Sequence, residues 1–439
     1  MPVRATKPRL DDPFLILVLG DFSGRASRGV MTPVEGRTPI QIDCDSVDDA
    51  MKRLQVKLRI PVETRNLDLE FHGLDDFHPD HLFESLNIFD DLRDALQSQP
   101  PKPVSTRRTA PAQPSDILSG SLLDQIAEGT DPLQSFIDKA VLPHLVAKES
   151  DSDQKRKSRI QSMAAEALRA LIHHQYFQRV EAAWRGLDFL VRNVETSSQL
   201  KIYLFDMSLD ELRATPAGMQ QLLAPEKKWS LILTDYVFGP KIEDIELLAR
   251  LSLTAANAEA PLVAQASPNV LGCRSIAETP GPYDWDLDQP LWEELRNFPE
   301  SNWLALAMPT FMGRMPYGRN GFSTERLPFE EIISESKHSD YLWCNAAFAV
   351  GALIARSFTE SGWKMRLGEF RTLDRMPMHV HDGELKPGAE VLLTQTAVER
   401  MIEHGLMPLI SRKDGDSLMI GMFQSVNRGN PALQGRWRF

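Results

Sequence analysis

The chain has 439 residues, with 49 Lys and Arg against 61 Asp and Glu, a formal net charge of −12 and 42% hydrophobic residues. This acidic balance argues against wide nucleic-acid binding, which depends on counterion release by Lys and Arg. No stretch approaches the roughly 20 apolar residues that cross a bilayer, and the N-terminus lacks the apolar core of a signal peptide. We therefore expect two or three domains and a place in the cytoplasm.

The first 97 residues have the pattern of a small α/β unit. The apolar run Phe14–Leu19, closed by Gly20-Asp-Phe-Ser-Gly24, predicts a buried strand that ends in a turn. The other elements expected here are strands at 40–42 and 67–71 and helices at 47–56 and 79–96.

A proline-rich linker is predicted at residues 98–115. This segment has five prolines and no acidic residue, and such a composition cannot bury enough surface to order itself. The linker separates a small domain, 1–97, from a larger domain, 116–439, which we expect to be helical over 116–195 and α/β over 196–439. The fold class is therefore predicted as α/β (α+β), with a mixed sheet covered by helices in the larger domain.

The larger domain alternates between helix-like and strand-like segments. A long amphipathic stretch over 160–191 is interrupted by the polar His173-His174-Gln175. A hairpin is predicted from 406–410 and 418–422 around Asp414-Gly-Asp416. The other expected elements are helices at 117–126, 133–145, 242–255, 341–361 and 396–404, and strands at 200–205, 229–234, 262–266 and 391–393.

The densest group of imidazoles and carboxylates consists of His72, His78, His81, Asp75, Asp76 and Asp80. Such nitrogen and oxygen ligands can hold zinc, manganese or iron, so a metal-dependent enzyme is a rival hypothesis. The loose spacing and the segment Asp76-Phe-His-Pro-Asp80 instead favour a helix start, where carboxylates cap free amides and face the helix dipole.

Other candidates for chemistry are weaker. His379 and His381 would share one face of a strand, but Asp382-Gly383 indicates a tight turn and no third ligand is close in sequence. Gly20–Gly24 follows a strand but lacks the Gly-Lys-Ser/Thr of a phosphate loop. A small-molecule pocket at the strand ends around these residues is the third hypothesis. Because acid, base and nucleophile are never close together in sequence, we expect neither enzymatic activity nor a cofactor.

Two regions of the sequence, in order, resemble the two subunits of a known assembly. The first resembles the small subunit, and the second the large subunit, of the contractile sheath of bacterial type VI secretion. The matching segments are Pro13–Gly24, Ile42–Met51 and Leu69–Asp80 in the first region, and His173–Leu187, Leu233–Leu248, Ala260–Pro268, Arg314–Gly318 and Tyr341–Ala347 in the second.

The resemblance implies a structural, oligomeric protein of a secretion apparatus. In the family, small and large subunits form heterodimers that stack around an inner tube, and an AAA+ unfoldase disassembles the contracted sheath. The partners implied are the chain itself or other sheath subunits, the inner tube protein, the baseplate and the unfoldase. Fusion of both subunit types would fix their stoichiometry and raise their effective concentration.

The resemblance also implies features beyond the matched segments. Family large subunits continue past the match that ends at Val426, and this continuation carries strands that interlace neighbouring protomers. An alternative expectation is therefore a sheath cap or accessory protein, which docks on the end of a sheath without polymerising. The unfoldase of the family grips a helix near the start of the large subunit. The corresponding place here predicts Leu122, Leu123 and Ile126 as partner-binding residues.

Overall fold

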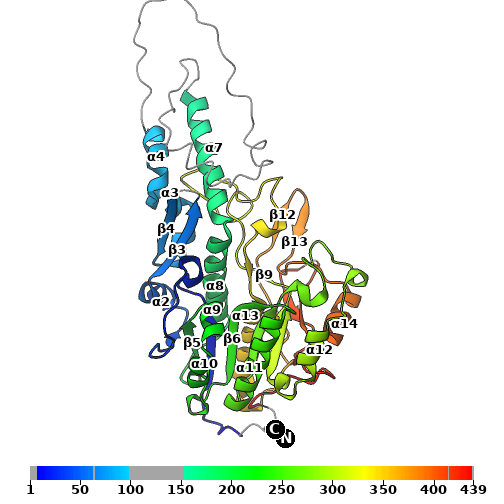
Figure 1. Ribbon diagram of the computed structural model, residues 1–439. Coiled ribbons are helices and arrows are strands. Elements are labelled where there is room, and N and C mark those ends of the chain that lie inside the picture. The colour runs from blue at the N-terminus through cyan, green and yellow to red at the C-terminus, as the bar shows by residue number, and fades with distance from the viewer. Residues whose placement is uncertain (1–6, 63–64, 98–152, 414, 438–439) are drawn as a thin grey trace, which may run out of the picture.

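A computed structural model describes residues 7–62, 65–97, 153–413 and 415–437, and shows a large mixed sheet with helices on both faces (Figure 1). The predicted linker at 98–115, the helices predicted at 117–126 and 133–145, and Leu122, Leu123 and Ile126 lie outside the described residues. Among the described residues, no helix combines the length and the apolar character needed to cross a membrane. The fold class is α/β, as expected.

The central sheet has nine strands in the order β11-β15-β14-β8-β7-β6-β1-β5-β2. Strands β5, β1, β6, β7, β8 and β14 run parallel, whereas β2, β15 and β11 pair antiparallel to their neighbours. Their bounds are β1 Phe14–Gly20, β2 Ile40–Ile42, β5 Leu200–Asp206, β6 Leu231–Phe238, β7 Leu262–Ala266, β8 Leu304–Met308, β11 Thr372–Leu373, β14 Met407–Ser411 and β15 Leu418–Ile420.

The first strand of the chain lies inside the sheet of the second region. Leu17 of β1 is in register with Tyr203 of β5 on one side and with Ile232 of β6 on the other. A parallel strand in this position is buried on both faces, which explains its almost continuous apolar sequence. Residues 14–20 therefore do not fold apart from the larger region, although the domain boundary predicted near 97–116 stays a prediction.

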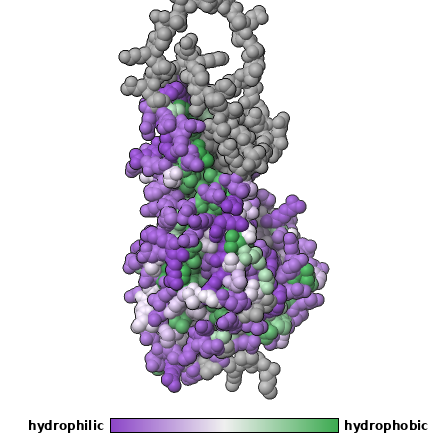
Figure 2. Space-filling view, turned by 60° about the vertical axis from the view of Figure 1, so that its left-hand side comes forward, coloured by the Kyte–Doolittle hydropathy of each residue, from purple (hydrophilic) through white to green (hydrophobic). Residues whose placement is uncertain are grey.

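Helices cover the two faces of the sheet. The first face carries α7 Asp153–Ile172, α8 Gln175–Arg192 and α13 Ala346–Ser361, and the second carries α11 Ile242–Ala258, α12 Pro290–Asn297 and α14 Gln395–Glu403. Figure 2 shows the outer surface of one side as largely hydrophilic with smaller hydrophobic patches, as is ordinary for globular proteins.

The remaining small-region elements pack on the first face. Strands β3 Val56–Val62 and β4 Arg65–Phe71 form an antiparallel pair. Together with α2 and the 3₁₀ helix η1, they supply buried residues to the same core as α8. The other described elements, apart from short 3₁₀ turns, are α1 Arg25–Arg28, α2 Val47–Leu54, η1 Leu74–Phe77, α3 Pro79–Ser85, η2 Asn87–Phe89, α4 Asp90–Gln97, α9 Leu209–Ala214, α10 Pro216–Leu222, β9 Phe311–Met312, β10 Trp343–Cys344, β12 His379–His381 and β13 Glu384–Lys386.

Several predicted bounds need correction. The helix predicted at 47–56 ends earlier because Gln55 takes a left-handed conformation with φ 53°, after which β3 begins. The helix predicted at 79–96 is divided, since Leu86 is extended between α3 and η2. The helix predicted from 341 begins at Ala346, capped by Asn345, and no strand forms at 391–393. The predicted break is confirmed at His173 and His174, whereas Gln175 already belongs to α8, and the hairpin of β14 and β15 is confirmed.

Candidate functional site at the junction of the two regions

Helix α8 is the element that joins the small and large regions. Its apolar residues recur every three or four positions, so Phe177, Val180, Trp184 and Leu187 are all buried on one side. His174 begins the helix, because its Nδ1 accepts the backbone N–H of Tyr176 at 3.2 Å. The amphipathic pattern read from the sequence thus corresponds to the face that meets the small region.

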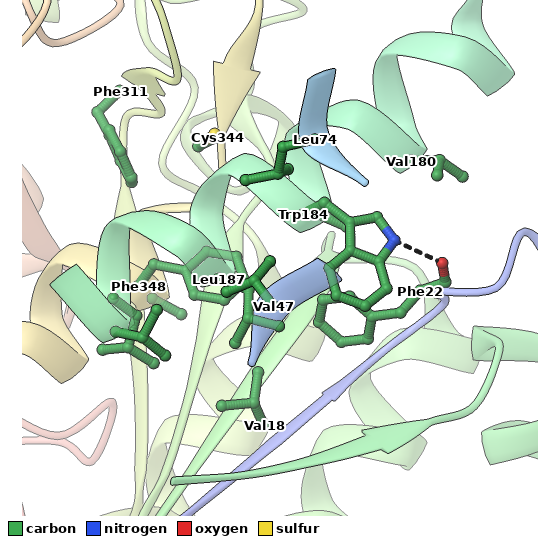
Figure 3. Packing of buried hydrophobic residues seen from close by; sticks show 14 of the residues in the cluster. Val18, Phe22, Val47, Leu74, Val180, Trp184, Leu187, Phe311, Cys344 and Phe348 are labelled. Carbon is green, nitrogen blue, oxygen red and sulfur yellow. Dashed lines mark hydrogen bonds between the residues drawn. The ribbon is translucent and has the colours of Figure 1, made fainter. Parts of the chain in front are cut away.

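Trp184 lies at the centre of this junction (Figure 3). Its side chain is fully buried, and its Nε1 donates a hydrogen bond of 2.8 Å to the backbone carbonyl of Phe22. The Phe22 ring packs edge-on against the indole, with 5.4 Å between ring centroids. Val18 and Val47 of the small region belong to the same buried cluster. One side chain of the large region therefore packs within residues of the small region.

A second contact brings α8 close to α13. A Cβ atom at Gly186 would lie 2.5 Å from the ring of Phe348, so only glycine permits the observed approach. Phe348 belongs to α13 and is buried in the same core as Trp184. The Trp-Arg-Gly segment of α8 thus fixes contacts to the small region and to α13 within three residues.

Three phenylalanine rings extend the junction toward the β3–β4 pair. Phe71 and Phe77 of the small region stack with 4.4 Å between centroids. Phe177 of α8 meets both rings edge-on, at 5.8 Å and 5.6 Å. Such aromatic pairs are worth about 0.5–1.5 kcal/mol each beyond their buried area. The junction is therefore an apolar core rather than a loose contact between domains.

Polar contacts surround this apolar core. The Asp80 carboxylate accepts the backbone N–H groups of Glu325 at 2.7 Å and Arg326 at 3.1 Å. Arg185 donates to the carbonyl of Leu74 at 3.3 Å, and the Arg326 side chain pairs with Glu84 at 2.5 Å. Because the Arg326–Glu84 pair is solvent-exposed, its expected contribution to stability is only about 0–1 kcal/mol.

The histidine and aspartate group of residues 72–81 forms helix-start contacts. Asp76 accepts the backbone N–H of His72 at 2.5 Å and of Gly73 at 3.1 Å. The ring of His78, rather than a carboxylate, caps α3 by accepting the Asp80 N–H at 3.1 Å. Within the described residues, no group of three or more His, Cys, Asp or Glu side chains is placed to hold a metal ion. Capping by a carboxylate is confirmed for Asp76, whereas His78 caps α3 and the Asp80 carboxylate instead accepts the backbone N–H groups of Glu325 and Arg326.

His379 and His381 lie on a short hairpin, as predicted. Strands β12 and β13 pair antiparallel across Asp382 and Gly383, whose φ angles of 49° and 79° form the turn. The Nδ1 atom of His379 and the hydroxyl of Tyr341 are 3.0 Å apart and form a hydrogen bond. This histidine is thus part of the packing beside β10.

A buried ion cluster lies beside α8. Arg314 is 2.7 Å from a carboxylate oxygen of Glu181 on α8 and 2.7 Å from one of Glu331. All three side chains are almost completely buried. Although burial alone would lower the pKa of Arg314, the charges of Glu181 and Glu331 raise it well above its ordinary value. Glu331 also accepts the backbone N–H of Tyr317 at 2.7 Å.

Only part of this cluster could be found from the sequence. Arg314 stands out as a cation beside Tyr317, and the guanidinium lies 4.0 Å from the ring centre. Glu181 is the one acid between the buried Val180 and Trp184 of α8, and this position within an apolar stretch is the feature of the sequence that indicates its burial. No local sequence pattern indicates the burial of Glu331, because its position depends on the course of the loop after Arg314.

The sheet order and this shared core define an α/β protein with one mixed sheet that is covered by helices on both faces. Two family models match the chain: the VipA family of the type VI secretion system over residues 5–99, and the VipB tail sheath N-terminal domain over 154–221 and 226–427. The chain belongs to the type VI secretion tail sheath family, with small-subunit-type and large-subunit-type regions on one polypeptide.

One curated relative is the type VI secretion system sheath protein TssC1 of Pseudomonas aeruginosa. The two chains are 31% identical over 276 residues, which cover 56% of this chain and 55% of the relative. The chain thus spans about half the length of this relative. The resemblance read from the sequence motifs is confirmed, and the metal-dependent alternative is not favoured.

Proposed function

We propose that the chain is a structural component of a type VI secretion contractile sheath in which one polypeptide supplies both subunit types as a single folded unit. The observation that supports this proposal most directly is the position of β1, which pairs with β5 on one side and β6 on the other. A small-subunit strand inside the large-subunit sheet makes the pair inseparable without unfolding.

This function implies specific partners. The chain would associate with itself or with other sheath subunits, surround the inner tube protein and contact the baseplate in the bacterial cytoplasm. Family membership supports a role without catalysis. The comparisons do not favour the end-capping alternative, which the assembly experiment below nevertheless tests.

The test is reconstitution followed by electron microscopy. The purified chain, carrying a gold-labelled tag, is mixed with separately expressed small and large sheath subunits and with inner tube protein. Tubules with label along their whole length are the expected result. Label only at tubule ends or on isolated rings would identify a cap, and a chain that stays monomeric under all conditions would contradict the proposal.

We further propose that Leu122, Leu123 and Ile126 bind the sheath-disassembling unfoldase. The support is the position of these apolar residues just after the proline-rich segment, where the resemblance places the recognition helix. Replacing all three by Asp should abolish ATP-dependent disassembly of contracted tubules, while Asp at Ser121 and Gln125 serves as the matched control. Equal disassembly of both variants would contradict this assignment.

A further inference from the structure

A pocket of about 540 Å³ opens at the carboxyl ends of β1, β6 and β7. The first two turns of α8, the loop after β1 and the segment that leads into α13 supply much of the rest of its wall. The side chains that matter for its chemistry are Asp21, Tyr176, Arg179, Asp235, Gln265 and Trp343.

The pocket lies where the strand order changes direction. From β1, the next parallel strand, β5, is added on one side, whereas β6, β7 and β8 are added on the other. In open α/β sheets the connections diverge at such a point and leave a crevice beyond the carboxyl ends of the strands, which is where ligands bind. The place coincides with Gly20–Gly24, which the sequence already suggested as the edge of a pocket.

Two carboxylates in the wall differ in their surroundings. Asp21 is satisfied internally, because it accepts the backbone N–H groups of Arg25 at 2.6 Å and Ala26 at 2.8 Å. The side chain of Asp235 makes no hydrogen bond or ion pair with any described residue, and only part of it is exposed. Burial, and then the nearby charge of Asp21, raise the pKa of the Asp235 carboxyl well above its ordinary value.

An acid in this state favours a positively charged ligand. A carboxylate that is largely removed from water and has no partner is costly, and an opposite charge with hydrogen-bond donors removes that cost. Among the described residues, Arg179 is the single cation that lines the pocket, and its side chain is exposed. An anion such as phosphate would therefore be repelled by two acids and attracted by only one solvated cation. Tyr176 and Trp343 add aromatic rings, which attract cations.

We propose that this pocket binds a cationic group, guanidinium or ammonium, which pairs with Asp235 while its apolar stem lies beside Tyr176 and Trp343. The source is either an arginine or lysine side chain of a neighbouring sheath subunit or a free small amine. Only the first source rests on the proposed sheath function. The pairing itself rests on the pocket and on Asp235.

The test uses a matched pair of probes that differ in charge. Acetyl-arginine amide and its neutral analogue acetyl-citrulline amide are titrated into the full chain by calorimetry, with thermal shift as a second readout. We expect the arginine probe to bind at least roughly tenfold more tightly than the citrulline probe, since a desolvated charge pair is lost in the latter. Equal binding of the two probes, or no binding of either at millimolar concentration, would overturn the proposal.

A variant assigns the binding to Asp235. Asp235→Asn keeps the shape and removes the charge, so it should fold normally and lose roughly tenfold or more in affinity for the arginine probe. The control Asp382→Asn removes an exposed carboxylate, 70% accessible, in the β12–β13 turn and should bind as the unmodified chain does. Asp235→Asn removes a charge that has no partner, so the variant should fold at least as well as the unmodified chain, as judged by circular dichroism. Loss of its fold would contradict the account of Asp235 as a carboxylate without a partner.

The assembly reaction separates the two sources. If a neighbouring subunit supplies the cation, the arginine probe slows tubule growth and Asp235→Asn assembles poorly, while Asp382→Asn assembles normally. If binding persists but assembly is unaffected by probe and variant, the ligand is a free amine. Failure of the unmodified chain to assemble would contradict the sheath function and would leave the calorimetric result on the pocket intact.

Discussion

The two faces of the central sheet differ in where their residues come from. On the face covered by α8 and α13, the core mixes both regions: Val47, Phe71 and Phe77 of the small region pack with Trp184 and Phe348 of the large region. On the face covered by α11, α12 and α14, the small region contributes little to the core besides alternate residues of β1.

This difference shows how one chain unites two subunit types. Apart from β1 and β2, which pair within the sheet, the small region packs mainly on the first face through apolar burial, whereas the opposite face is a nearly self-contained core of the large region. A perturbation on the first face should therefore loosen the small region, and an equivalent one on the second face should not.

The largest expected effect comes from truncating the central tryptophan of each face. Trp184→Ala and Trp292→Ala each remove a fully buried indole, and each should lower the free energy of unfolding by about 3–5 kcal/mol. Hydrogen exchange followed by mass spectrometry distinguishes the faces. Only Trp184→Ala should accelerate exchange in β4 and η1.

Trp292 is a suitable control because its indole is bonded in the same manner. Its Nε1 donates to the carbonyl of His404 at 3.1 Å, as that of Trp184 donates to Phe22. Faster exchange of β4 in the Trp292→Ala variant, or none in Trp184→Ala, would show that the faces are not independent.

Removing the cation of the buried cluster should have a similar or slightly smaller effect. Arg314→Met leaves Glu181 and Glu331 buried without their partner, and breaking such a pair typically costs about 3–5 kcal/mol. Denaturant unfolding measures the loss. Adding Glu181→Gln and Glu331→Gln to Arg314→Met should restore part of it, and no recovery in this triple variant would argue against charge as the cause.

A buried histidine on the second face should make stability depend on pH. Burial and then the charge of Arg296 lower the pKa of His404 from 6.5 to about 4. Because the unfolded chain takes up this proton below pH 6.5 and the folded chain does not, stability should fall as the pH drops from 6.5 toward 4. The loss attributable to His404 is about 2 kcal/mol at pH 5.

His404→Gln isolates this effect. The Nε2 atom of His404 lies 3.1 Å from the carbonyl oxygen of Val270, and a glutamine amide can donate to the same oxygen. The variant should lose less stability than the unmodified chain between pH 7 and pH 5 in denaturant titrations. Identical slopes would assign the acid sensitivity to other groups.

The smallest effect is expected at the solvent-exposed rim of the junction. Arg326→Met breaks the Arg326–Glu84 pair, whose side chains are 58% and 48% exposed, and should change the unfolding free energy by less than about 1 kcal/mol. Urea titration with and without added salt measures this. A loss as large as that of Arg314→Met would mean that the rim, rather than the core, holds the regions together.

Local sequence patterns predicted those elements whose burial is regular. The run Phe14–Leu19 and the amphipathic stretch broken at His173 correspond to β1, α7 and α8, because periodic burial leaves a period in the sequence. Strand β8 is not predicted, although Pro309 follows its Leu-Ala-Leu-Ala-Met run, because leucine and alanine favour a helix at least as much as a strand.

The parts that sequence reasoning missed depend on contacts between distant segments. The motif resemblance identified both regions but not the shared sheet, because nothing in Phe14–Leu19 reveals which strands pair with it. Asp235 likewise resembles an ordinary polar residue at the end of a predicted strand, and its enclosure by α8 and by the segment that leads into α13 depends on the fold. Pairing and enclosure are properties of the fold rather than of local segments.

The central place of β1 has a consequence during protein synthesis. The ribosome makes β1 first, but its partners β5 and β6 follow roughly 190–215 residues later, or about 10–40 s at the usual rates of synthesis. Throughout that time a wholly apolar strand has both hydrogen-bonding edges unpaired, a state prone to aggregation or chaperone capture. Encoding both regions in one reading frame ensures that the matching strands emerge from the same ribosome.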